Sequence, residues 1–362
     1  MENKFTKQDL MAFQAESLSD KFQRTLAKVA EWYSRWDNQV YVSFSGGKDS
    51  TVLADICAKW CKVSGTTLYL VFVNTGLEYP EIQKFVKEYA EYLRNKYDIE
   101  VVLDVLRPKT RFDEVIKKYG YPLISKAVSG CIYGAKANPN GVKYKQICGE
   151  YETNGKLSMF NYGKYKDLLY VNFNISDMCC TVMKKAPMHE YQHRNARQPI
   201  IATMASESQL REMNWMRSGC NAFDGKNPRS APMSFWTNQD VLEYIKEEEL
   251  PIASVYGDIV YAEDSEQMRL EDYGIDCGGK EKLRTTGCDR TGCIFCAFGC
   301  HLEKEPSRFQ RLKETHPRQY EYCIGGGEYD EDGIWKPNKQ GLGMGHVFDE
   351  LNKLYGENFI KY

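Results

Sequence analysis

The feature that most constrains this chain is a pair of glycines, Gly46 and Gly47, between a β-prone run and an apolar helical pattern. Residues 40–44 form the β-prone run, and the helical pattern continues through Val52 and Leu53. A strand, a glycine turn and a helix N-terminus form an anion site, because the first helical turn has unsatisfied N–H groups and the positive end of the macrodipole. Glycines also let the backbone approach a phosphate closely. The predicted phosphate-binding residues are Ser43, Phe44, Ser45, Gly46, Gly47, Lys48 and Ser50.

Asp49 indicates that a divalent cation takes part. A carboxylate beside phosphates is repelled unless a cation lies between them, and Mg²⁺ is usually held jointly by a carboxylate and substrate phosphates. We therefore expect Lys48, Asp49 and Ser50 to be catalytic. The spacing is neither that of a Walker loop nor that of a Rossmann glycine motif. The alternative is an ordinary Gly–Gly turn with an Asp or Ser cap, but the flanking strand and helix patterns favour the phosphate site.

Composition places the chain among ordinary globular proteins. It has 362 residues, 42% of them hydrophobic and 27% charged, and a net charge of −2. This charge excludes a dominant polyelectrolyte surface, so any nucleic-acid site has to be a local basic patch. No apolar run approaches the roughly 18 residues of a membrane span, and the N-terminus lacks the apolar core of a signal peptide. We expect a cytoplasmic protein in which the 13 cysteines are metal ligands, catalytic groups or core residues more often than disulfides.

Apolar runs alternate with helical patterns in the first third of the chain. Strands are predicted at 40–44, 67–73 and 99–105, with a helix over 81–97 between the last two. This alternation predicts an α/β fold, a doubly wound and mainly parallel sheet flanked by helices, with a smaller cysteine-rich C-terminal region. The predicted division is an N-terminal helical segment (1–37), a nucleotide-binding domain (38–250) and a cysteine-rich metal-binding region (251–362). Ligands of such sheets bind beyond the carboxyl ends of the strands, where Ser45 to Ser50 and Asn74, Thr75 and Gly76 are expected.

The middle of the chain has weaker patterns. Residues 120–166 are rich in Gly, Asn, Lys and Tyr without a clear period, which is typical of an irregular lid over the nucleotide or of a mobile loop. Regular structure is expected again at 168–173 and 199–204. A Thr cap at Thr237 predicts a helix through Ile245.

Four cysteines within 13 residues are a metal signal. Cys288, Cys293, Cys296 and Cys300 lie close in sequence, and two thiolates in a Cys-x-x-Cys turn reach one metal. The distant pair Cys179 and Cys180 is able to complete the site. Zinc needs four tetrahedral ligands, and a 4Fe–4S cluster also needs four cysteines, so the sequence does not choose the metal. The alternative role, buried apolar filler, is expected for Cys57, Cys61, Cys131, Cys148 and Cys220, and is open for Cys300.

Five segments in one order carry a family resemblance over about residues 38–300. They are Ser45–Ser50, Asn74–Gly76 with Tyr79–Pro80, Cys179–Pro187, Ala205–Ser208 with Arg211, and Phe235–Ile245. In this order they resemble the phosphoadenosine phosphosulfate reductase family within the PP-loop ATP pyrophosphatase (adenine nucleotide α-hydrolase) superfamily. The resemblance implies ATP or a sulfonucleotide with Mg²⁺ at Ser45–Ser50, adenosine at Asn74–Gly76, and a 4Fe–4S cluster on Cys179, Cys180, Cys293 and Cys296, with Cys288 competing for one position. It also implies a second anion at Lys184, Lys185 and Arg211. For these three, solvated surface charge is the alternative, and for Glu207 and Ser208 the alternative is a helix cap.

Two departures from the family's reductases shape the expected function. The phosphate loop is intact, as in ATP-cleaving members, and the C-terminal Glu-Cys-Gly-Leu-His motif of the reductases is missing. We therefore expect an enzyme that cleaves ATP at the α,β-phosphate bond, by adenylation, and transfers sulfur at the cluster to a nucleic acid or small acceptor, with a sulfur donor protein as partner. The alternatives are a reductase of adenylyl sulfate or phosphoadenylyl sulfate, and a non-catalytic nucleotide-binding regulator with structural zinc or another metal. The oligomeric state stays open, a homo-oligomer included.

Overall fold

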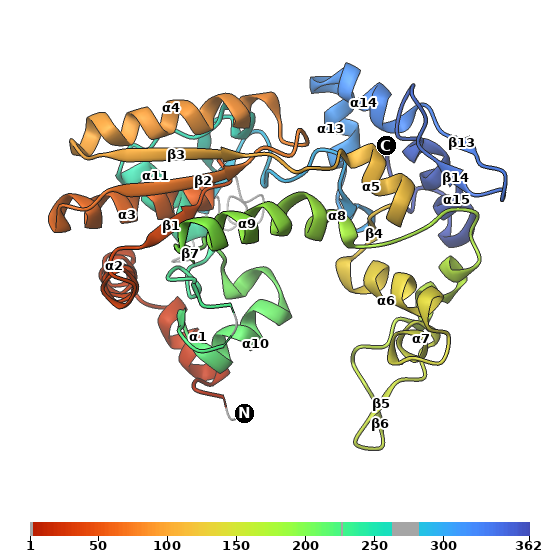
Figure 1. The fold of residues 1–362 in the computed structure, drawn as a ribbon, viewed down its shortest axis with the longest axis horizontal. Helices are drawn as coiled ribbons and strands as arrows, with labels where there is room; N and C mark the ends of the chain where they lie inside the picture. Colours follow the sequence, from red (N-terminus) through yellow and green to blue (C-terminus); the bar gives the residue numbers. More distant parts are fainter. Residues whose placement is uncertain (1–2, 226, 263–281) are drawn as a thin grey trace, which may run out of the picture. The chain divides into compact units, whose positions relative to one another are not determined.

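The computed structural model describes residues 3–225, 227–262 and 282–362, which fold as two compact units (Figure 1). Unit 1 consists of Met1–Asn74, Glu78–Leu106 and Glu190–Thr291, and unit 2 consists of Thr75–Leu77, Arg107–His189 and Gly292–Tyr362. Each unit is thus assembled from separated stretches of sequence. The domain boundaries expected after residues 37 and 250 stay predictions.

Unit 1 is built on a six-stranded sheet with the order β3-β2-β1-β7-β9-β8. Its pairs are parallel except for β8 and β9. The chain order reverses at β1, the strand before the glycine pair, so β1 marks the switch point at which ligands of such sheets bind. The strands predicted at 40–44, 67–73 and 99–105 are confirmed. The sheet comprises β1 (Val40–Ser43), β2 (Leu68–Val73), β3 (Val101–Leu106), β7 (Gln198–Ile200), β8 (Asn221–Ala222) and β9 (Arg229–Ser230).

Helices pack on both faces of this sheet. Alternate residues near β1 point in opposite directions: Tyr41 packs on Tyr191 of α9 with ring centroids 5.2 Å apart, and Phe44 stacks on Tyr89 of α4 at 5.6 Å. The predicted doubly wound α/β class is therefore confirmed. The helices and remaining strands of this unit are α1 (Lys7–Gln14), α2 (Leu18–Arg35), α3 (Lys48–Ser64), α4 (Pro80–Tyr97), the C-terminal part of α9 (Ala186–Asn195), η3 (Ala205–Glu207), α10 (Gln209–Ser218), α11 (Asn238–Glu247), η4 (Ser254–Tyr256), β10 (Ile259–Tyr261) and β11 (Leu283–Thr285).

Polar contacts fix α11 on the N-terminal helices. Thr237 caps α11 in a capping box with Asp240, which confirms the helix predicted there. The ammonium of Lys21, in α2, lies 2.7 Å from the Asp240 carboxylate, and both side chains are at least 90% buried. The second carboxylate oxygen of Asp240 accepts the Thr237 N–H, so this buried charge pair is hydrogen-bonded on both sides.

Unit 2 consists of short helices around small two-stranded pairings. Residues 126–148 form α6 and α7 where an irregular segment was expected. That expectation was wrong: α6 buries Val128, Cys131, Ile132 and Ala135 on one helical face behind a Ser125 cap. The regular structure expected at 168–173 is limited to the end of η1, at Leu169, and to a single bridge between Phe173 and Trp335. The elements are α5 (Phe112–Tyr119), β4 (Leu123–Ile124), α6 (Lys126–Ala137), α7 (Val142–Cys148), β5 (Glu152–Thr153), β6 (Lys156–Leu157), η1 (Gly163–Leu169), α8 (Met178–Cys180), η2 (Thr181–Lys185), β12 (Ala297–Phe298), η5 (Cys300–Leu302), α13 (Arg308–Thr315), α14 (Pro317–Ile324), β13 (Glu328–Tyr329), β14 (Trp335–Lys336) and α15 (Met344–Tyr355).

No helix in the described part of the chain combines the length and the apolar character needed to cross a membrane.

Candidate nucleotide and metal sites

The glycine pair forms the turn between β1 and α3. Gly46 has φ of +73°, and a Cβ there would lie 2.8 Å from the Val86 Cγ2 and 2.9 Å from the Ile82 Cγ2. Only glycine fits this conformation and this space. Helix α3 then begins at Lys48, and its N-cap residue Gly47 provides no side-chain cap. The N-terminus of α3 therefore lies at the switch point without a side chain of its own to cap it.

Hydroxyl groups hold this loop in shape. The Ser45 and Ser50 hydroxyls lie 3.0 Å apart, and the Ser50 hydroxyl donates to the Gly47 carbonyl at 2.8 Å. The Thr51 hydroxyl donates to the same carbonyl at 3.1 Å, and the Gly47 N–H donates to the Ser45 hydroxyl at 3.3 Å. The serines predicted to bind phosphate are thus brought together with the glycines, and they stabilise the loop.

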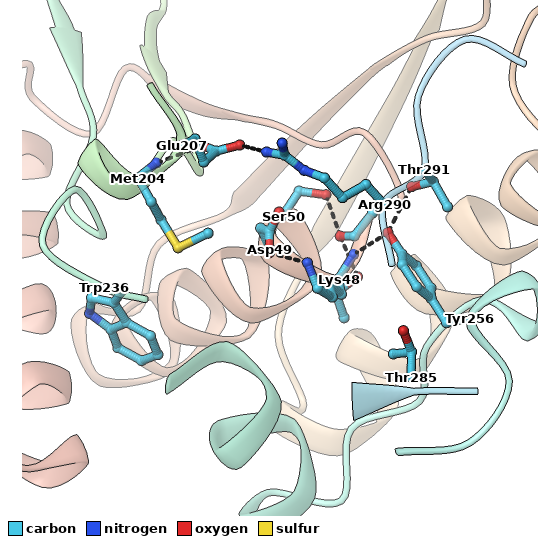
Figure 2. Close-up of polar contacts among 12 residues, drawn as sticks. Lys48, Asp49, Ser50, Met204, Glu207, Trp236, Tyr256, Thr285, Arg290 and Thr291 are labelled. Carbon is cyan, nitrogen blue, oxygen red and sulfur yellow. Dashed lines mark hydrogen bonds and ion pairs between the residues drawn. The ribbon is translucent and has the colours of Figure 1, made fainter. Parts of the chain in front are cut away.

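A cleft of about 390 Å³ adjoins the loop and contains charges of both signs. Lys48 is 3% exposed, and its ammonium lies 3.0 Å from the Asp49 carboxylate. The other charged residues that line the cleft are Glu207, Arg284, Asp289 and Arg290. Figure 2 shows Lys48, Asp49 and Ser50 at the start of α3, with Arg290 reaching across toward Glu207. The cleft therefore combines a buried cation and a carboxylate beside a helix N-terminus.

Glu207 occupies the position where two cations converge. Its carboxylate pairs with both Arg211 and Arg290, and it accepts the Met204 N–H at 2.9 Å. Burial and the neighbouring Arg290 charge lower the pKa of Arg211. Ser208 caps α10 by accepting the Arg211 N–H, so the cap considered for Ser208 is present. Arg211, predicted to hold an anion, is thus paired with a carboxylate.

Tyr256 is a site residue that the sequence did not single out. Its hydroxyl accepts the Lys48 N–H at 3.1 Å and lies 2.7 Å from the Thr291 hydroxyl (Figure 2). Burial raises the pKa of Tyr256 to about 12, so the phenol stays neutral. Arg290 was also missed, although a cation between Cys288 and Cys293 was a usable signal. Tyr256 gave no such signal, because only the fold brings it to the loop.

The remaining predicted nucleotide contacts are divided between the units. In unit 1, Ser43 ends β1, the side chain of Phe44 is buried, and the amide of Asn74 donates to Gln83 at 3.1 Å. Thr75 and Gly76 belong to unit 2, as do Lys184 and Lys185 in η2.

Four of the five predicted metal ligands belong to unit 2, where Cys180, Cys293 and Cys296 lie near enough to Cys179 to act on its pKa. The Cys179 thiol and the Cys180 thiol are hydrogen-bonded, and the charges of Cys296 and Cys293 act on Cys179. That hydrogen bond and burial raise the pKa of Cys179. Cys288 belongs to unit 1, where its thiol lies 4.0 Å from the Tyr79 hydroxyl.

Cations surround the four thiols. The hydrogen bond from Cys179 lowers the pKa of Cys180, and the charges of Lys126 and Lys184 lower it further. Arg308 donates from Nη1 to the Cys296 carbonyl at 2.8 Å, and Glu303 holds the same guanidinium at 2.6 Å. Burial raises the pKa of Cys296, while the Arg308 charge opposes this rise. Lys184, predicted to hold a second anion, therefore acts on the cysteines.

The donor set fits a thiolate-ligated metal by its chemistry. Four thiols are collected in one unit, and three cationic side chains offset the charge that four thiolates carry. Within residues 3–225, 227–262 and 282–362, no three His, Cys, Asp or Glu side chains already surround a point where one metal ion would bind. The nearby Cys300 donates to the Ala297 carbonyl at 3.0 Å and is 3% exposed, as expected for a core residue.

Comparison with known proteins gives short matches to sequences and weak matches to structures. An uncharacterized protein of Methanocaldococcus jannaschii is 33% identical over 115 residues, which cover 32% of this chain and 22% of the relative. A second uncharacterized protein of that organism is 35% identical over 102 residues, 27% of this chain and 22% of the relative. The chain thus spans about a fifth of the length of both relatives.

Three solved structures match with low TM-scores. NH3-dependent NAD synthetase from Campylobacter jejuni has a TM-score of 0.34 at 12% identity, covering 73% of this chain and 90% of its own. NMN synthetase from Francisella tularensis has a TM-score of 0.31 at 14% sequence identity, and the match covers 65% of this chain and 72% of the synthetase chain. The U34-tRNA thiolase NcsA from Methanococcus maripaludis, with its 4Fe–4S cluster, has a TM-score of 0.35 at 17% sequence identity. The match covers 70% of this chain and 72% of the thiolase chain. The family model of the phosphoadenosine phosphosulfate reductase domain matches residues 39–148 and 143–298, most of the chain, and the protein therefore belongs to this family.

Proposed function

We propose that this protein is an enzyme that cleaves ATP between its α- and β-phosphates and couples the adenylated product to sulfur transfer at a cysteine-ligated iron–sulfur cluster. The observation that carries the proposal is the complete phosphate loop at the end of β1. It has an α3 N-terminus whose N-cap residue, Gly47, offers no side-chain cap, the buried cation Lys48 and the carboxylate Asp49, all beside a 390 Å³ cleft. Membership of a sulfur-handling family and the four thiols of unit 2 support the second half.

The residues of the loop have defined parts in this chemistry. An acceptor oxygen attacks the α-phosphorus, the bond from that phosphorus to the bridging oxygen breaks, and pyrophosphate leaves. The α3 N–H groups and Lys48 stabilise the charge on the leaving group, which is the usual source of catalysis in such sites. Asp49 would hold Mg²⁺, which when bound would offset the charge of the phosphates. A sulfur nucleophile then bonds to the activated carbon as its bond to the AMP oxygen breaks.

Cys179, Cys180, Cys293 and Cys296 would hold the cluster, with Lys126, Lys184 and Arg308 balancing its charge. When bound there, the cluster supplies a place to receive and deliver sulfur from a donor protein. Zinc on the same thiols is the alternative metal. Metal and acid-labile sulfide analysis after anaerobic purification separates the two, and a colourless zinc protein would remove the cluster-dependent half of the proposal.

The deciding experiment measures pyrophosphate released from ATP with Mg²⁺ and candidate acceptors. We expect release that depends on Mg²⁺. Family membership favours a second function, reduction of adenylyl sulfate or its 3′-phosphate. Sulfite formed from a sulfonucleotide and a thiol donor, with ATP left intact, would establish that function and overturn the first.

A further inference from the structure

Residues 126–170 of unit 2 form a basic arm in a chain whose net charge is −2. Seven lysines and three acidic residues lie in this stretch, and all ten are exposed. In Figure 1, α6, α7 and the β5–β6 hairpin follow one another within unit 2. Among the described residues, no carboxylate forms an ion pair with any of the seven lysines, although Lys126 also acts on the Cys180 thiol. The lysines are Lys126, Lys136, Lys143, Lys145, Lys156, Lys164 and Lys166.

The arm is an ordered framework. Asn154 and Gly155, with φ of +53° and +73°, form the two-residue turn of the β5–β6 hairpin, as an Asn-Gly pair favours. The Asn161 side chain accepts the Tyr151 N–H at 2.8 Å and donates to its carbonyl at 2.8 Å. The Tyr162 N–H donates to the Gln146 carbonyl at 2.7 Å. The backbone that carries the lysines therefore has a defined conformation.

Exposed rings lie close in sequence to these lysines. Tyr133 is 39% exposed, Phe160 40% and Tyr170 77%. Each is followed or preceded by a lysine three or four residues away, as in the pairs Tyr133 with Lys136 and Tyr170 with Lys166. Rings that accept unpaired bases and cations that accept phosphates are the two components of single-strand recognition.

We propose that the basic arm binds single-stranded nucleic acid, and that this strand presents the acceptor for the chemistry proposed above. The inference rests on the proposed function for the acceptor role, but binding by the arm is measured separately from catalysis. A lipid surface is the competing partner, since Leu157 and Met159 at the hairpin are 68% and 67% exposed. The distribution of rings over the whole arm favours a strand, because a membrane anchor needs its apolar residues on one face.

The test uses the full-length protein and a labelled single-stranded RNA of mixed sequence, with affinity measured over a series of salt concentrations. The variant K136Q/K145Q/K156Q/K166Q removes four charges whose side chains make no contacts that hold the arm. Each phosphate contact on a single strand contributes about 0.7 to the salt slope, so we expect a slope smaller by about 3. The matched control K7Q/K62Q/K84Q/K87Q removes four exposed charges from unit 1 and should leave the slope within about 1 of the wild-type value.

Ring removal tests the other half of the recognition. In the variant F160A/Y170A we expect roughly a tenfold or greater loss of affinity with an unchanged salt slope, because stacking does not release counterions. Equal effects of the two lysine variants, or binding to phosphatidylserine vesicles in place of RNA, would overturn the proposal. Complete competition by polyglutamate with no effect of F160A/Y170A would overturn it too. Pyrophosphate release without RNA binding would sink this inference alone, whereas RNA binding without ATP cleavage would sink the proposed function.

Discussion

Asp49 is the residue on which the proposed chemistry depends, because it is a carboxylate placed beside a phosphate site. In the free protein it pairs with Lys48, whose side chain is almost completely buried. Under the proposed function, nucleotide binding would bring more negative charge to the same place, and the pair alone would not balance it. A divalent cation held by Asp49 would resolve this conflict.

The first prediction concerns this carboxylate. In Asp49→Ala we expect Mg²⁺-dependent pyrophosphate release to fall by about a hundredfold or more, because a charge-stabilising group is lost from the transition state. Asp289→Ala is the matched control, since Asp289 lines the same cleft but lies outside the loop, and it should retain most activity. Thermal melting checks that both variants fold. Equal losses in the two variants would show that Asp49 has no special part.

Gly46 provides the second prediction, on stability. In Gly46→Ala the new Cβ meets Val86 and Ile82 below 3.0 Å at a positive φ, so we expect a loss of more than about 2 kcal/mol in the free energy of unfolding. Gly65→Ala is the control, because Gly65 has φ of +66° with no atom within 4 Å of the added Cβ. It should lose only about 1 kcal/mol. Denaturant unfolding measures both, and equal losses would contradict the packing argument.

His301 makes unit 2 sensitive to acid. Its Nδ1 is buried and has no hydrogen-bond partner among the described residues, and burial together with the Lys164 charge lowers its pKa below 6.5. Below pH 6.5 the unfolded state therefore binds a proton more readily than the folded state, and stability falls as the pH falls toward the folded pKa. We expect wild-type melting temperatures to drop over this range more than those of His301→Asn. If the melting temperatures of the two proteins fell equally with pH, His301 would not be the source of the acid sensitivity.

At the scale of elements, the phosphate loop was predictable and the residues around it were not. Residues 40–44 are β-prone, residues 67–73 are mostly apolar, and a glycine pair follows the first run after Ser45, so the local pattern was enough. Tyr256 and Arg290 reach the loop only through η4 and the segment after β11, far along the chain. Helix α7 was missed because Ile147 is its single buried residue. Helix α6 does bury one face, but Gly130 and Gly134 interrupt its apolar pattern in the sequence.

The first residue of helix α13 contacts the Cys-x-x-Cys turn. It begins at Arg308, which binds the Cys296 carbonyl and is fixed by Glu303, and this segment follows the residues that the family model matches. In Arg308→Gln we expect a reconstituted cluster to be lost to a chelator about tenfold faster, because outer-shell partners typically contribute 10–100-fold to metal affinity. Its midpoint potential should also fall, since a cation that favours the reduced state is gone.

Arg311→Gln is the control for α13, because its guanidinium donates to the Pro306 carbonyl at 2.9 Å on the exposed side. It should leave both the rate of cluster loss and the potential unchanged. Failure of the wild-type protein to hold any cluster would count against the proposed function. A stable cluster that is indifferent to Arg308 would count only against this role.

At the scale of the whole molecule, the family match ends at residue 298, yet unit 2 needs the residues after it. The buried Tyr121 hydroxyl donates to the Leu342 carbonyl at 2.8 Å, and the Trp335 N–H donates to the Asn172 carbonyl at 2.6 Å. Leu342 and Phe348 are completely buried. The sheet of unit 1 uses no strand from this part of the chain.

A chain that ends after Phe298 should therefore lose unit 2 and keep the sheet of unit 1. We expect rapid proteolysis within residues 107–189, because Tyr121 and Phe173 lose the groups that cover them. Any metal that the thiols of unit 2 hold in the full-length protein should be lost as well. ATP binding to the cleft should persist, since the loop, Glu207 and Arg290 all belong to unit 1. Leu342→Ala is the milder test of the same packing, with an expected cost of about 2–5 kcal/mol. A truncated chain with wild-type protease resistance and metal content would show that residues 299–362 are dispensable for unit 2.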